Sequence, residues 1–147
     1  MRPQSIVTFE RIYWLTLILA GIAVALNWNG MMRVAQSQPG VPPSLMTGIV
    51  IGSLIFIGLL ALLLWFFIAR RASNVAKWIF VAATAYAIWT FVKGLLLPEM
   101  PKDALFAINA INQLLSIYCC WLLFRPDAAA WLDSKGSDGP GDPKTFD

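Results

Sequence analysis

The residues best suited to bind a polar ligand form one stripe near the end of the chain. They lie in the apolar run Ala104–Phe124 and recur at helical spacing: Asn109, Asn112, Gln113 and Ser116. On a helix these side chains fall within about 100° of arc. A carboxamide both donates and accepts hydrogen bonds, which suits a small polar ligand, but it also hydrogen-bonds between packed helices in a membrane. The stripe therefore indicates a polar cavity or a packing surface, and we favour packing.

The sequence offers little for catalysis. It has no histidine, the side chain that most often serves as an acid or base near neutral pH and as a metal ligand. Its two cysteines, Cys119 and Cys120, are adjacent, and neighbouring cysteines bridge each other only with strain. A disulfide-exchanging quinone reductase relies on paired C-x-x-C thiols, which the chain lacks. We therefore expect no catalytic residue, no metal site, no cofactor and no enzymatic activity.

The composition is typical of a membrane protein. Hydrophobic residues make up 59% of the 147 residues and charged residues only 13%, about half the charged share of a soluble domain. The net charge of +3 is modest, and the cations are spread along the chain. Because a nucleic-acid-binding domain needs a clustered basic surface, we expect no nucleic-acid partner.

Four apolar segments reach the ~20 residues that a helix needs to cross a bilayer core. They are residues 12–32, 45–69, 75–97 and 104–124. Since a backbone in lipid must satisfy its own hydrogen bonds, each is predicted to be a helix. The sequence thus predicts an all-α, four-helix integral membrane bundle covering residues 1–132. Residues 133–147, rich in Gly, Pro and Asp, are expected to form a flexible tail.

Small residues suggest how these helices pack. Thr16, Ala20, Ala23, Asn27 and Gly30 share one narrow face of the first segment. The second segment contains a G-x-x-x-G pair, Gly48 and Gly52, which in membranes allows close backbone approach. We therefore expect Asn27, Gly48 and Gly52 to lie at contacts between helices.

The basic stretch between the second and third segments predicts the topology. With four spans, eight of the eleven Lys and Arg residues lie on one side: Arg2, Arg11, Arg70, Arg71, Lys77, Arg125, Lys135 and Lys144. The positive-inside rule then places both termini in the cytoplasm. Arg70, Arg71 and Lys77 are interpreted as topology determinants that also contact anionic lipid headgroups. After the last span, residues 128–136 are expected to form a short interfacial helix, with Trp131 and Leu132 dipping into the headgroups.

Three stretches at these boundaries, "RPQSIVTFERIYWL", "WFFIARRASNVAKWIF" and "WLLFRPDAAAWL", resemble those of a group of small four-span inner-membrane proteins of proteobacteria. That group carries basic and aromatic residues at the same three boundaries and has no assigned activity. The resemblance implies a multi-pass protein of the bacterial inner membrane and transfers no catalytic residue.

Two functions follow as expectations. The first is a non-enzymatic membrane protein that acts by association with itself or with a larger membrane complex, with the lipid bilayer as its other partner. The second is a small oligomeric transporter or channel with a polar cavity on the fourth helix. In size and span count the chain resembles small multidrug-resistance carriers, but those use a glutamate at mid-membrane in the first helix. Here that helix has only Glu10, at its edge, so we favour association.

Overall fold

The computed structural model describes residues 3–37, 40–96 and 103–134, and these form helices joined by short connections. The helices are α1 (Gln4–Leu26), α2 (Trp28–Gln36), α3 (Pro43–Ala69), α4 (Asn74–Leu95), α5 (Ala104–Leu123) and α6 (Pro126–Asp133). The predicted all-α fold is confirmed for this part of the chain. Four of the helices, α1, α3, α4 and α5, are long and apolar enough to cross a membrane.

The helices begin where the local chemistry favours a start. Proline occupies the first turn of α3 and of α6, where its missing N–H costs no hydrogen bond. The Ser73 hydroxyl accepts a hydrogen bond from the Ala76 N–H at the start of α4 (3.3 Å), and the Asp103 carboxylate accepts one from the Phe106 N–H at the start of α5 (3.0 Å). Such caps satisfy backbone donors that have no partner within the helix.

The first span differs from its prediction. Residues 12–32 were expected to form one helix, but α1 begins at Gln4 and ends at Leu26, and α2 follows after a break at Asn27. The start is earlier because Ile6 and Phe9 are fully buried in the protein, which the hydropathy of the segment does not reveal. The break occurs because Asn27 leaves helical geometry, with φ −95° and ψ 7°.

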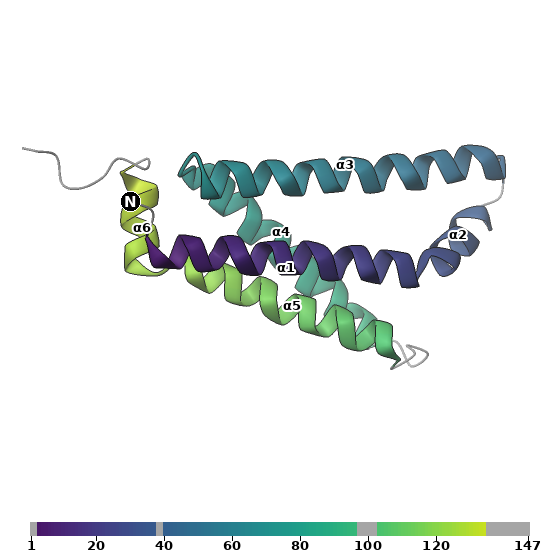
Figure 1. The fold of residues 1–147 in the computed structure, drawn as a ribbon. Helices are drawn as coiled ribbons and strands as arrows, with labels where there is room; N and C mark the ends of the chain where they lie inside the picture. Colours follow the sequence, from purple (N-terminus) through teal and green to yellow (C-terminus); the bar gives the residue numbers. More distant parts are fainter. Residues whose placement is uncertain (1–2, 38–39, 97–102, 135–147) are drawn as a thin grey trace, which may run out of the picture.

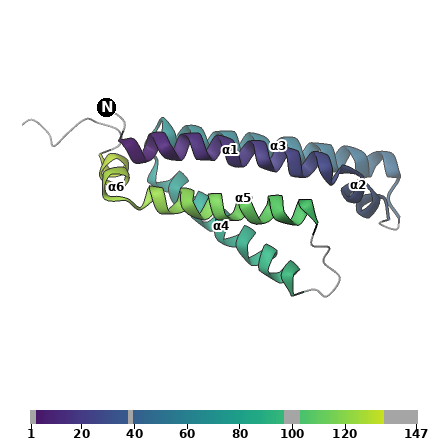
Figure 2. The ribbon, with the colours of Figure 1, turned by 60° about the horizontal axis from the view of Figure 1, so that its bottom comes forward.

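The four spanning helices run up and down between two ends of the molecule. The start of α1, the connection at residues 70–73 and α6 lie together, and we call this the basic end (Figures 1 and 2). The connection is tight: Ala72 has a positive φ of 47°, and the Ser73 N–H donates to the Phe67 carbonyl. The break at Asn27, α2 and the start of α3 lie at the opposite end (Figure 1).

The core lies at the basic end. The rings of Phe9, Tyr13 and Phe80 pack against one another. The centroid of Phe9 lies 5.4 Å from that of Tyr13 and 5.8 Å from that of Phe80, and the centroids of Tyr13 and Phe80 are 5.6 Å apart, all within the range of favourable aromatic contacts. Around them are buried side chains from α3, α5 and α6: Ile68, Cys119, Leu122, Leu123, Ala128, Trp131 and Leu132. Every long helix therefore contributes to one cluster, and the helices are held together mainly at this end.

Towards the opposite end the helices separate. Figure 2 shows α4 leaving α3 and running out beyond α5, while α1 packs mainly on α5. None of the residues in the most apolar 18-residue window of α3 is buried, although this helix has the highest mean hydropathy of the four, 2.8. The helices are therefore closely packed at the basic end, and α3 presents most of its surface to its surroundings.

The short helix α6 folds back onto the protein. The backbone N–H and the hydroxyl of Ser5 both donate to the Asp127 carboxylate, at 3.2 and 2.9 Å, and the Asn74 amide donates to Asp133 at 2.9 Å. The predicted short helix is present and begins at Pro126, where proline and Asp127 suit a helix start. Trp131 and Leu132, expected to enter the headgroups, are instead 9% and 1% exposed and join the core. The expected flexible tail falls, beyond Ser134, outside the described residues.

Candidate functional site

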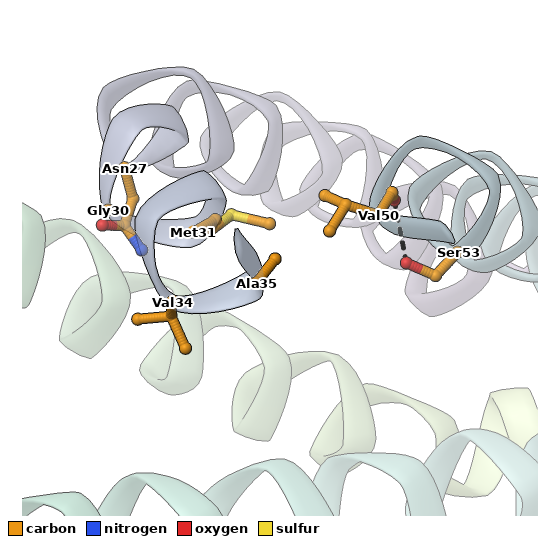
Figure 3. A pocket seen from close by; sticks show the side chains of 7 residues that line it. All are labelled: Asn27, Gly30, Met31, Val34, Ala35, Val50 and Ser53. Atoms are coloured by element: carbon orange, nitrogen blue, oxygen red, sulfur yellow. Dashed lines mark hydrogen bonds between the residues drawn. The ribbon is translucent and has the colours of Figure 1, made fainter. Parts of the chain in front are cut away.

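Two pockets lie side by side at the end opposite the basic end, and Asn27 and Met31 line both. The first, the amide pocket, has a volume of about 250 Å³ and lies between α1, α2 and α5; its lining is Ala20, Ala23, Val24, Asn27, Met31, Leu105, Asn109 and Asn112. The second, the α2–α3 pocket, has a volume of about 510 Å³ and is lined by Asn27, Gly30, Met31, Val34, Ala35, Val50 and Ser53 (Figure 3).

The amide pocket brings together three carboxamides from two spans. Asn109 and Asn112 lie one turn apart on α5, and Asn27 approaches from the end of α1. The Oδ1 atom of Asn112 is buried, and among the described residues it has no hydrogen-bond partner. Because a buried polar atom without a partner costs free energy, such an atom beside a pocket usually bonds to a water molecule or a ligand.

The predicted polar stripe of α5 divides in two. Asn109 and Asn112 line the amide pocket, whereas Gln113 lines neither of the two pockets and stays half-exposed. The Ser116 hydroxyl donates to the Asn112 carbonyl of its own helix at 2.9 Å, so its hydrogen-bonding capacity is partly used locally. The small residues Ala20 and Ala23 of α1 do face this stripe, as the packing hypothesis expects.

The α2–α3 pocket is less polar. The Ser53 hydroxyl donates to the Val50 carbonyl at 2.8 Å, as the dashed line in Figure 3 shows, so it is not free to bind a ligand strongly. The Asn27 carboxamide folds over Gly30, where an added Cβ would lie 2.6 Å from its Oδ1. Gly30 therefore gives the Asn27 side chain the room it occupies.

The position of Asn27 differs from the one that the sequence predicted. We expected it to pack against another helix as part of one continuous face. The structure places it at an interruption of the first span, between two pockets. In membrane proteins, interrupted helices are tolerated where they line a cavity, and they often mark binding sites. The signal in the sequence is "NWNG", which puts two asparagines and a glycine inside an apolar run.

The glycine pair of α3 makes no contact within this chain. A Cβ added at Gly48 or at Gly52 would meet nothing within 4 Å. On α3 the half-buried positions include Val50 and Leu54, each two residues and so about 200° around the helix from a glycine of the pair. The glycines point outward for this reason, and our expectation that they pack against another helix of this chain is wrong. Their packing against another chain stays a prediction.

The three cations expected to contact lipid headgroups differ in their surroundings. The Lys77 side chain is nearly buried, and its Nζ lies 4.8 Å from the ring centroid of Phe124 and 5.7 Å from that of Trp78. Arg70 pairs with Glu10 at 3.4 Å and stacks on Trp65 at 5.6 Å. Arg71 is exposed. Lys77 thus uses its charge on aromatic rings of its own chain, which leaves Arg71 as the cation best placed to contact headgroups.

The described residues contain no group of three His, Cys, Asp or Glu side chains that could hold a metal ion. Cys119 is fully buried in the core, where a thiol behaves as a small apolar group. The hydrogen bond from the Ser5 hydroxyl lowers the pKa of Asp127, but this carboxylate has a structural role in holding α6.

The chain matches no protein-family model, no curated protein and no solved structure in the comparisons made. The resemblance to small four-span proteobacterial proteins therefore stays a prediction drawn from the three boundary stretches.

Proposed function

We propose that this chain is a non-enzymatic, multi-pass protein of the bacterial inner membrane that acts by association, with itself or with a larger membrane complex. The observation that carries the proposal is the surface of α3. This helix is the most apolar span, none of its central window is buried, and its Gly48–Gly52 pair is open to a partner. Small residues spaced by four on an outward face allow a second helix to approach closely, and such pairs drive association in membranes.

A transporter or channel receives less support from the geometry. A route across the membrane must pass both ends of the molecule, but the basic end is filled by the rings of Phe9, Tyr13 and Phe80 and by α6. The described part of the spans also carries no Asp or Glu near their middles, where proton-coupled carriers place their relay groups. The polar cavity on α5 is consequently open only in the half of the molecule opposite the basic end.

The association proposal is tested by placing a large side chain on the outward face of α3. In Gly52→Ile we expect self-association in lipid bilayers to weaken about tenfold, equivalent to about 1.4 kcal/mol, because the second helix can no longer approach. Stability of the monomer should change little, since an added Cβ meets nothing within 4 Å. Energy transfer between labelled copies, measured over a range of dilutions in lipid, reports the association.

Gly58→Ile is the matched control. Gly58 is equally open but lies six residues on, about 120° around the helix from Gly52. Equal association of the two variants would contradict a role for this face. A wild-type protein that stays monomeric at all dilutions and co-purifies with no partner in mild detergent would contradict association altogether.

A further inference from the structure

We propose that the amide pocket is a binding site for a small uncharged group that carries both hydrogen-bond donors and acceptors, a hydroxyl or a primary amide. The ligand is either a free solute or the uncharged glycerol end of a lipid headgroup. This site is separate from the association face of α3 and holds whether or not the protein self-associates.

The polarity of the pocket selects such a ligand. Three residues that carry carboxamides, Asn27, Asn109 and Asn112, line it from two helices, and the other lining side chains are apolar. Each carboxamide offers two donors and an acceptor, so a ligand that only donates or only accepts would leave part of the pocket unpaired. The Asn112 Oδ1 is buried and has no partner among the described residues, and a rotation of the Asn112 amide towards the pocket would make it the acceptor that the ligand satisfies.

The charge of the pocket excludes ions as ligands. None of the described residues that line it is charged. An ion that entered would give up its hydration without a counter-charge, and this desolvation is costly in apolar surroundings. Neutral groups lose less on entry and recover their hydrogen bonds from the amides.

The volume sets the size of the ligand. At about 250 Å³ the pocket exceeds the ~30 Å³ that a water molecule occupies in the liquid, and it is smaller than the ~300–1,000 Å³ typical of drug-sized ligands. A molecule of a few heavy atoms, such as glycerol or acetamide, fits this range. The break at Asn27 supports the same assignment, because an interrupted membrane helix commonly marks a binding site.

The test is a titration of the full-length protein in phosphatidylcholine nanodiscs with glycerol and, separately, with acetamide. The side-chain NH₂ signals of asparagine and glutamine are followed by NMR. We expect the signals of Asn27, Asn109 and Asn112 to shift and saturate, whereas that of Gln113, which lines neither pocket, stays in place. Acetate and guanidinium at equal concentrations should give no saturable shift.

Two variants locate the site. Asn112→Leu removes the orphaned acceptor and should weaken binding roughly 3- to 10-fold, the effect of one hydrogen bond. Ala20→Leu keeps all three amides but fills the pocket, and it should abolish the saturable shift. Retained signals elsewhere in the spectrum show that each variant is folded, and the wild-type titration, with Gln113 as its internal control, stands without them.

Lipid composition separates the two sources of the ligand. If the shifted signals appear in phosphatidylglycerol nanodiscs without added solute, the ligand is the glycerol headgroup; if they appear only with solute, it is the free molecule. Both results support the site. Shifts that never saturate, that include Gln113 equally, or that are absent with every probe would overturn it and leave the pocket as a water-filled gap.

Discussion

At the scale of single residues, Ser5 and Asp127 link the two ends of the described chain. Ser5 is almost fully buried, and both its N–H and its hydroxyl donate to the Asp127 carboxylate. Asp127 also lies in the first turn of α6, where a negative charge interacts favourably with the helix dipole. One pair of residues therefore fixes both the start of α1 and the orientation of α6.

Replacing Ser5 by Ala should loosen α6. The loss of one hydrogen bond typically costs about 0.5–1.5 kcal/mol, and we expect the low end because the Asp127 side chain is 38% exposed. Hydrogen exchange of the amides of α6 is the measurement, and exchange should speed up there more than in α3. Thr8→Ala is the control, since the Thr8 hydroxyl bonds only to the carbonyl of Gln4 in its own helix. If α6 exchanges alike in both variants, the Ser5–Asp127 contact does not hold it.

The same contact should weaken in acid. The hydrogen bond from Ser5 lowers the pKa of Asp127 in the folded protein. Its stabilisation is therefore complete above the unfolded aspartate pKa of about 3.9 and is lost as the pH falls through the lower, folded value. Protection of α6 against exchange, measured relative to the intrinsic exchange rate at each pH, should fall in the wild type below about pH 4, and in Ser5→Ala the fall should be smaller.

At the scale of elements, the break between α1 and α2 rests on a close approach of side chain and backbone. Because an added Cβ at Gly30 would lie 2.6 Å from the Asn27 Oδ1, Gly30→Ala should force that side chain to move. The cost is small, since a flexible side chain can rotate, but it offsets the gain of about 0.5–1 kcal/mol that alanine brings to a helix. We expect the thermal stability in detergent to stay close to that of the wild type.

Gly21→Ala provides the comparison. Gly21 lies inside α1, and an added Cβ there meets nothing within 4 Å, so this variant should gain the full helix-propensity benefit and melt at a higher temperature. The side-chain NH₂ signals of Asn27 should shift in Gly30→Ala and stay in place in Gly21→Ala. Equal stabilisation with unmoved Asn27 signals would show that the side chain does not occupy this position.

Hydropathy predicted the later spans closely. The expected segments 45–69, 75–97 and 104–124 became Pro43–Ala69, Asn74–Leu95 and Ala104–Leu123, because length and apolarity decide which segments can cross a bilayer. The inward face of a span is harder to predict. In lipid both faces are apolar, so hydrophobic periodicity does not distinguish Val50 and Leu54, which face the protein, from Gly48 and Gly52, which do not.

The candidate site was predictable only in part for a similar reason. Asn109 and Asn112 were recognised as a polar stripe because the helical spacing of α5 holds throughout. For Asn27 the same reasoning assumed an unbroken helix from Ala23 to Gly30. Ala20, Ala23 and Asn27 do line one pocket, but the helical geometry is interrupted at Asn27, and Gly30 beyond it lines the second pocket.

At the scale of the whole molecule, the cations are distributed unequally between its two ends. Among the described residues, Arg11, Arg70, Arg71, Lys77 and Arg125 lie on the parts of the chain that reach the basic end, whereas Arg33 and Lys93 lie towards the other end. The start of α1 and the whole of α6 share the basic end (Figure 1). Contacts of α6 with Ser5 and Asn74 tie these parts together, and four spans would place them on the same side of a membrane.

This asymmetry predicts that the basic end is cytoplasmic. Reporter fusions after Arg71 and after Phe146 should both read as cytoplasmic, and a fusion after Gly40 should read as external. The first two results are coupled, because residues 70–73 and α6 meet at one end in the structure, and a molecule with four spans has no arrangement that separates them without unfolding the core around Phe9 and Leu132. An external reading from the Phe146 fusion alone would therefore contradict the four-span fold. External readings from both, with a cytoplasmic reading after Gly40, would keep the fold and reverse only its orientation.

Charge reversal at Arg71, which is exposed, tests whether the charge of the loop or the packing of the helices sets the orientation. If the cations set the orientation, Arg71→Glu should raise the share of inverted molecules, whereas Arg33→Glu at the other end should not.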